Sequence, residues 1–155
     1  MEILHLSEKN YLVSRWSGGK TVQIAIAPGD AAYAERDFLW RISSASVDLP
    51  ESEFTPLPDY NRWIATLDNQ ITLTHEGRKQ ILLKPLSPYR FDGGDGTRSA
   101  GQCTDFNLML RKGACDGSLR ALRLRAGMQK TLTLDIAGFW IDQTLTKQKA
   151  QNWRQ

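Results

Sequence analysis

Apolar and polar residues alternate in short segments along most of the chain, and turn-forming residues separate these segments. A period of two is typical of β-strands that bury one face. In Thr21–Ala27, for example, the alternation places Val22, Ile24 and Ile26 on one side. Helical periodicity is nearly absent, apart from a possible turn within Ala31–Arg36. The pattern predicts an all-β protein.

Further strands are predicted at Leu39–Val47, Trp63–Leu67, Gln70–His75, Gln80–Leu83, Cys103–Arg111, Leu119–Arg125, Thr131–Ile136 and Phe139–Leu145. Turn residues at Asp68–Asn69 and Glu76–Arg78 favour an antiparallel meander in the middle of the chain. The glycine-rich stretch Asp92–Gly101 is predicted to be a surface loop. The polar tail, Thr146–Gln155, is expected to form a short helix or to fray.

A chain of 155 residues fits one domain, so residues 1–155 are predicted to share a single core. Short antiparallel strands in one domain must stack as two sheets or close into a barrel to remove their edges. An antiparallel barrel or jelly roll is therefore the expected architecture. The mouth of such a barrel is a common site for a small ligand.

The net charge of +3 is small, although basic residues gather in the second half of the chain. Arg123 and Arg125 alternate with leucines, which favours a solvated strand face over a nucleic-acid site. The sequence lacks an apolar run long enough for a signal peptide or a membrane span. We therefore expect a cytoplasmic protein that binds neither membrane nor nucleic acid, with Cys103 and Cys115 as reduced thiols.

Several motifs point to chemistry but lack the residues that the chemistry needs. Gly18–Thr21 resembles the end of a phosphate-binding loop, but position 14 is serine and a strand follows where the motif needs a helix. His5 and His75 lie in separate segments without further ligands, and His75 is predicted to be a partly exposed turn residue. Cys103 lacks a neighbouring base and is predicted to be a buried, inert thiol. No metal, cofactor or catalytic residue is predicted.

Two strands carry polar residues where a half-buried strand normally has apolar ones. Arg41 and Ser43 share one face of the first, and Asp105 and Asn107 share one face of the second. If these faces meet inside a barrel, the guanidinium, hydroxyl and amide form a site for a carboxylate. In the alternative interpretations Arg41 forms a buried ion pair with Asp105 or Asp59, or lies exposed on the surface.

Five blocks of the sequence resemble motifs of the HutD/Ves family, in the family's order. Phe38–Val47 is similar to its Phe-x-Trp-Arg-x-Ser-x-Ala-x-Val strand, and Asp105–Arg111 to its Asp-x-Asn-x-Met-x-Arg strand. The other three blocks are Trp16–Thr21, Glu53–Arg62 and Leu86–Gly93. The chain departs from the family motifs at Ser17, Lys20, Leu57, Pro58 and Asn61, and its second half is short.

The resemblance implies a cupin-like, bicupin-type β fold with a shortened second half, an association with bacterial histidine utilisation, and no established enzyme activity. It adds Arg62 and Thr21 to the candidate ligand-binding residues Arg41, Ser43 and Asn107, with Asp105 beside them.

The leading hypothesis is a non-enzymatic protein that senses or buffers a small carboxylate metabolite of histidine or amino-acid catabolism. One alternative is a metal-independent enzyme that uses Asp105 as a general base while Arg41 holds the charge of the substrate. Another is a structural protein that forms a homodimer through an exposed sheet edge.

Overall fold

The computed structural model describes residues 8–77, 80–122, 131–136 and 139–144. It contains strands and two short 3-10 helices but no α-helix among these residues, so the all-β prediction is confirmed. No helix in this part of the chain is long and apolar enough to cross a membrane. The chain divides into two compact units, and Leu6–Arg120 forms the larger one. The expectation of a single domain stays a prediction.

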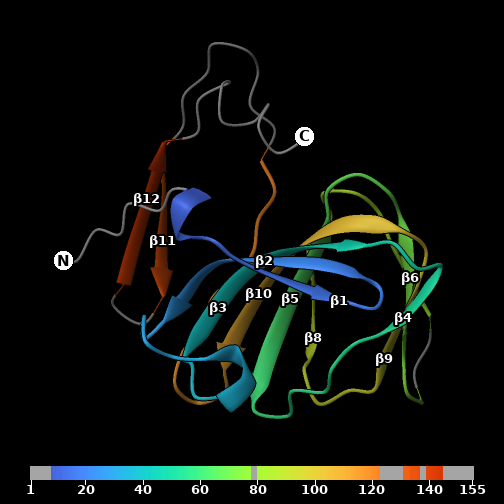
Figure 1. Ribbon diagram of the computed structural model, residues 1–155, viewed down its shortest axis with the longest axis horizontal. Coiled ribbons are helices and arrows are strands. Elements are labelled where there is room, and N and C mark those ends of the chain that lie inside the picture. Colours follow the sequence, from blue (N-terminus) through green and yellow to red (C-terminus); the bar gives the residue numbers. More distant parts are fainter. Residues whose placement is uncertain (1–7, 78–79, 123–130, 137–138, 145–155) are drawn as a thin grey trace. The chain divides into compact units, whose positions relative to one another are not determined.

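The larger unit contains ten strands and both 3-10 helices. Their bounds are η1 Glu8–Asn10, β1 Leu12–Trp16, β2 Gly19–Ala27, η2 Tyr33–Glu35, β3 Trp40–Val47, β4 Glu51–Glu53, β5 Tyr60–Thr66, β6 Ile71–His75, β7 Ile81–Leu83, β8 Tyr89–Asp92, β9 Thr97–Ala100 and β10 Cys103–Arg111. Six strands form one antiparallel sheet in the order β1-β2-β3-β10-β5-β8 (Figure 1). The other four form a second antiparallel sheet in the order β4-β9-β6-β7.

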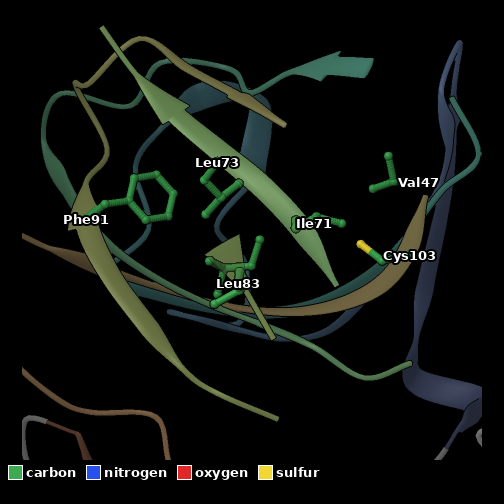
Figure 2. Close-up of a cluster of buried hydrophobic side chains, with 7 residues drawn as sticks. Val47, Ile71, Leu73, Leu83, Phe91 and Cys103 are labelled. Atoms are coloured by element: carbon green, nitrogen blue, oxygen red, sulfur yellow. The ribbon is translucent and has the colours of Figure 1, made fainter. Parts of the chain in front are cut away.

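The two sheets of the larger unit pack face to face around an apolar core (Figure 2). The six-stranded sheet contributes Val47, Ile64, Phe91 and Cys103, and the four-stranded sheet contributes Ile71, Leu73 and Leu83. All of these side chains are at most 6% exposed. Burial of their apolar surface is the main force that holds the sheets together.

A second apolar cluster lies beside the start of β3 and combines Phe38, Leu57, Tyr60 and Met109. The rings of Phe38 and Tyr60 stack with centroids 4.3 Å apart, and the Tyr60 hydroxyl donates to the Phe38 carbonyl oxygen at 2.9 Å. Tyr33 of η2 packs against this cluster. The loop between β2 and β3 is thereby anchored to the six-stranded sheet.

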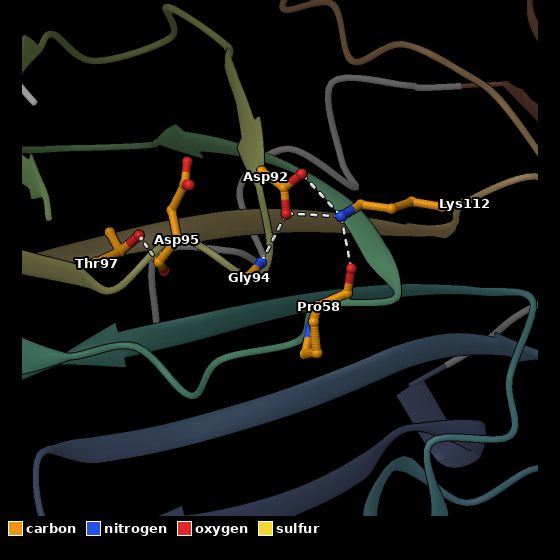
Figure 3. Close-up of polar contacts among 6 residues, drawn as sticks. All are labelled: Pro58, Asp92, Gly94, Asp95, Thr97 and Lys112. Carbon is orange, nitrogen blue, oxygen red and sulfur yellow. Dashed lines mark hydrogen bonds and ion pairs between the residues drawn. The ribbon is translucent and has the colours of Figure 1, made fainter. Parts of the chain in front are cut away.

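The turn after β8 is tied to the end of β10 through Lys112 (Figure 3). The Lys112 ammonium group lies 2.7 Å from both carboxylate oxygens of Asp92 and donates to the Pro58 carbonyl oxygen. Asp92 also accepts a hydrogen bond from the Gly94 amide at 2.8 Å. These contacts fix the segment that leads into β5.

The smaller unit contains two further strands, β11 Thr131–Ile136 and β12 Phe139–Thr144. They pair antiparallel, with Thr131 opposite Thr144 and Ile136 opposite Phe139. Both were expected from the alternation of apolar and polar residues. The polar tail Thr146–Gln155 lies outside the described residues.

The long, strongly alternating segments are the strands that the sequence predicts correctly. Cys103–Arg111 matches β10, and Leu39–Val47 matches β3 apart from its first residue. The possible turn at Ala31–Arg36 contains the 3-10 helix η2. The strands β1, β4, β8 and β9 were not predicted, because they are short or polar and their pairing depends on distant partners.

The predicted meander is wrong, because β5 and β6 lie in different sheets; of the strands β5, β6 and β7, only β6 and β7 pair with each other. The Asp68–Asn69 turn therefore connects two sheets. The predicted surface loop Asp92–Gly101 is wrong in its second half, where β9 pairs with β4 and β6 and buries Thr97 and Ser99. The glycine-rich sequence suggested a loop, but it does not show that β4 and β6 lie on either side of this segment and pair with it.

Two further predictions are wrong. His75 is 1% exposed, because β6 extends to it and β9 pairs alongside. Its ring nitrogens hydrogen-bond with the hydroxyls of Thr97 and Tyr89 at 2.9 and 3.2 Å. The predicted strand Leu119–Arg125 does not form over residues 119–122, and its remainder lies outside the described residues. Both edges of β10 already pair, with β3 and β5, so β10 offers this segment no free edge.

The core predicts a contrast between two leucines of the four-stranded sheet. Leu73 is fully buried, whereas Leu82 is 54% exposed. Leu73→Ala should lower the free energy of unfolding by about 2–5 kcal/mol, because it leaves a cavity between the sheets. Leu82→Ala should stay within about 0.5 kcal/mol of the parent protein. Urea denaturation measures both, and equal losses would contradict the assignment of the core.

Candidate functional site

A cavity of about 290 Å³ opens on the inner face of the six-stranded sheet. It is lined by Ser14, Trp16, Thr21, Tyr33, Arg41, Ser43, Ala45, Val47, Glu53, Phe54, Thr55, Arg62, Asp105, Asn107 and Met109. Every residue that the sequence nominates for ligand binding is therefore part of one cavity wall. Their role in binding stays a prediction.

Strand register explains why these side chains converge. Met109 of β10 lies opposite Arg41 of β3 on one side and opposite Arg62 of β5 on the other. Residues in register on neighbouring strands point to the same face, and adjacent strands are about 4.8 Å apart. The two guanidiniums therefore arise from one row of the sheet, about 10 Å apart at the backbone.

Arg41 is 5% exposed and is held by neutral groups. Its Nε donates to Gln23 Oε1 at 2.8 Å and its Nη1 to Ser43 Oγ at 3.3 Å. Burial lowers the pKa of Arg41 from its usual value, and the charge of nearby Arg36 lowers it further. The ion-pair alternatives from the sequence are wrong, because Arg41 forms no salt bridge to Asp59 or Asp105 in the described part of the chain.

Arg62 is 7% exposed and lies among aromatic rings. Its Cζ is 5.1 Å from the ring centroids of both Phe54 and Phe91, and its Nη1 donates to the Thr55 carbonyl oxygen at 3.3 Å. Burial lowers the pKa of Arg62 to about 10, so the guanidinium stays protonated at neutral pH. Its Nε is buried and has no hydrogen-bond partner within the described residues.

Asp105 and Asn107 form a second polar pair in the wall. Asp105 Oδ1 accepts hydrogen bonds from the Asn107 amide nitrogen at 2.6 Å and from the Ala45 backbone amide at 3.2 Å. Burial raises the pKa of Asp105 to about 7, although these hydrogen bonds and the charge of Arg62 oppose the rise. The Asn107 side-chain nitrogen donates to Asp105. The other end of the amide, Asn107 Oδ1, is buried and has no hydrogen-bond partner among the described residues.

The charges in the cavity wall favour an anion. Arg41 and Arg62 are buried cations, whereas Asp105 is only partly ionised near neutral pH. Glu53 also lines the cavity, but its carboxylate lies 2.9 Å from the exposed Arg98 guanidinium. A buried polar atom without a partner costs about 1–3 kcal/mol, so the free groups of Arg62 and Asn107 favour a bound polar ligand.

Sequence reasoning missed Gln23 and Tyr33, which both contact Arg41. Gln23 lies on the same face of β2 as Thr21, but its contact with Arg41 depends on the pairing of β2 with β3, which the sequence pattern does not show. Tyr33 belongs to η2, whose position depends on tertiary packing. Of the predicted residues, Ser43 is buried and bonds Arg41, while Thr21 is half-buried at the cavity wall.

No cluster of three or more potential metal ligands occurs among the described residues. The Cys103 thiol is buried in the apolar core, and burial raises its pKa to about 12. The prediction of a buried, inert thiol at Cys103 is therefore confirmed. Both cysteines of the chain are free.

Comparison with known proteins identifies the family. The HutD family model matches residues 8–152. The chain belongs to the HutD family. HutD from Pseudomonas fluorescens, solved in a formate condition, is 25% identical with a TM-score of 0.64, over 83% of this chain and 68% of that one. A conserved protein of unknown function from Pseudomonas aeruginosa is 26% identical with a TM-score of 0.68, over 83% of this chain and 67% of that one.

A more distant comparison concerns the fold alone. Ectoine synthase from P. lautus has a TM-score of 0.53 at 6% identity, over 64% of this chain and 68% of that one. A plant vicilin from Corylus avellana has a TM-score of 0.52 at 8% identity, over 68% of this chain and 31% of that one. The cupin-like fold implied by the resemblance is confirmed. The chain is a HutD-family protein related to histidine utilisation.

Asp105 should make the stability of this HutD-family protein depend on pH. Its folded pKa of about 7 lies above the ordinary value of 3.8, so the folded state holds a proton that the unfolded chain releases. The stabilisation is complete below pH 3.8 and is lost as the pH rises to about 7, by at most roughly 1.4 kcal/mol per pH unit. Asp105→Asn should flatten this slope. Urea denaturation between pH 4.5 and 8 measures the free energy of unfolding of both proteins. The same pH dependence in the parent protein and in Asp105→Asn would contradict the raised pKa of Asp105.

Proposed function

We propose that this protein binds a small carboxylate metabolite of histidine or amino-acid catabolism in the cavity on the six-stranded sheet. Binding takes place without turnover, so the protein senses or buffers the metabolite. The family membership supports the metabolic context. The chemistry of the cavity wall supports the class of ligand.

The observation that carries the proposal is a pair of buried guanidiniums without a carboxylate partner. Arg41 and Arg62 are 5% and 7% exposed, and neither forms a salt bridge within the described residues. A buried charge without a hydrogen-bonded counter-ion costs several kcal/mol, and Asp105, whose charge acts on Arg62 through space, is only partly ionised near neutral pH. A protein that only needed a stable core would place apolar residues there, so this cost favours a role in binding.

The size of the cavity supports a small ligand. Its volume of about 290 Å³ lies at the lower end of the usual range for ligand pockets, which is roughly 300–1,000 Å³. A guanidinium accepts a carboxylate in bidentate geometry. The free oxygen of Asn107 can accept an N–H or O–H from the rest of the ligand.

Removing the Arg41 guanidinium should abolish the binding of small acids while the protein stays folded. A thermal-shift screen with urocanate, formiminoglutamate, formylglutamate, glutamate and simple dicarboxylates should reveal an acid that raises the melting temperature, because a ligand of the folded state stabilises it. Calorimetry then compares the parent protein, Arg41→Ala and Arg90→Ala. The control removes an exposed arginine of β8 and the same charge. Unchanged binding in Arg41→Ala would rule out its role.

Arg62→Met should separate stability from binding. Methionine can fill the space beside Phe54 and Phe91 without the cost of burying a charge, so the free energy of unfolding should equal or exceed that of the parent protein. Binding of the acid found in the screen should weaken by at least about tenfold, because a charge-assisted hydrogen bond contributes about 1.5–3 kcal/mol. A destabilised variant that still binds would indicate a purely structural Arg62.

An enzyme that uses the same cavity is the second candidate, and the pKa of Asp105 favours it. A buried carboxyl group with a pKa of about 7 suits a general base at neutral pH. Turnover of an acid from the screen that Asp105→Asn abolishes would promote this candidate. Binding without turnover, retained in Asp105→Asn, would leave the binding protein as the better account.

A further inference from the structure

Arg41 is fixed by two neutral side chains that lie outside its own strand. Gln23 Oε1 accepts a hydrogen bond from Arg41 Nε at 2.8 Å, and the Tyr33 ring centroid lies 4.3 Å from Arg41 Cζ. We propose that Gln23 and Tyr33 are positioning residues for carboxylate binding, which orient Arg41 without neutralising its charge. This inference rests on the proposed function and names the residues that set the affinity of the site.

The hydrogen bonds of Arg41 leave its terminal edge for the ligand. Arg41 Nε donates to Gln23, and one hydrogen of Nη1 donates to Ser43. Nη2 donates to no group in the described part of the chain. The terminal nitrogens of a guanidinium can bind both oxygens of one carboxylate. A guanidinium already held in place loses less conformational entropy when the ligand binds.

A β-bulge follows Gln23 in β2 and determines which later residue of this strand lies opposite Arg41. Gln23 lies opposite Ser43 and Ala25 lies opposite Ile42, so one extra residue enters β2 between these pairs. Beyond the bulge, Ile26 instead of Ala25 lies opposite Arg41. Ile26 packs against the apolar cluster around Phe38 and Tyr60. Gln23, before the bulge, therefore supplies a neutral acceptor to the same guanidinium that Ile26, beyond the bulge, lies opposite.

Tyr33 is itself held in place by further contacts. The Arg36 Cζ lies 4.0 Å from the Tyr33 ring centroid, and the Arg36 guanidinium donates to the Tyr33 carbonyl oxygen. The Tyr33 and Phe38 ring centroids are 6.0 Å apart. A ring held this way keeps its π face against Arg41, which favours the charged guanidinium in that position.

The neutral hydrogen-bond acceptor Gln23 Oε1 is the contact of Arg41 that substitution can test most sharply. Glutamate at position 23 would keep the hydrogen bond to Nε but would also supply a carboxylate that neutralises Arg41. Methionine would keep the length of the side chain and the charge of Arg41 but would remove the acceptor. The two substitutions therefore separate the charge of Arg41 from its orientation.

The experiment combines calorimetric titration with glutarate and NMR measurement of proton exchange at the Arg41 Nε–H, assigned by its loss in Arg41→Lys. Gln23→Met should accelerate that exchange and weaken glutarate binding by about tenfold, since it removes a hydrogen bond to a charged group. Gln23→Glu should keep the exchange slow yet abolish binding. Slow exchange in Gln23→Met, or full binding in Gln23→Glu, would overturn the role of Gln23.

The tyrosine arm uses Tyr33→Phe and Tyr33→Leu. The phenylalanine variant keeps the ring and should bind within about twofold, whereas the leucine variant should bind about 3- to 20-fold more weakly. Equal losses in both variants would overturn the role of the ring. If the parent protein does not bind glutarate, the proposed site fails for this acid, and the exchange rates in Gln23→Met still decide whether Gln23 orients Arg41.

Discussion

The register of three adjacent strands, β3, β10 and β5, is the constraint on which the site depends. It sets Arg41, Met109 and Arg62 in one row on the inner face of the six-stranded sheet. Because side chains in register share a face, a slip of β3 or of β5 by one residue would turn its guanidinium out of the cavity. The apolar packing that fixes this register therefore also fixes the geometry of the polar site.

The inner face of the six-stranded sheet has two parts with different roles. At one end Val47, Ile64, Phe91 and Cys103 pack against the four-stranded sheet and supply stability. At the other end the same strands carry buried polar groups whose hydrogen bonds are incomplete within the described residues. Rigid strands on the apolar side hold these groups in place, so a ligand meets side chains that are already oriented.

The candidate residues could be found from the sequence because polar side chains interrupt an otherwise apolar strand face. Arg41, Ser43, Asp105 and Asn107 stand out by alternation alone, and the family resemblance added Arg62 and Thr21. Gln23 shares the face of Thr21 on β2, but its contact with Arg41 depends on the pairing of β2 with β3, which alternation does not reveal. Tyr33 lies between β2 and β3, and its place over Arg41 depends on how this connection folds back onto β3, which the strand pattern does not show.

The sequence by itself determined the all-β class with its long alternating strands, the polar faces of β3 and β10, and the family, since these features are encoded in local alternation and in ordered motifs. Tertiary structure alone decided which strands pair, that β5 and β6 separate into two sheets, and that His75, Thr97 and Ser99 are buried. Pairing between distant strands is set by the shared core, and the sequence of a single strand does not reveal its partner.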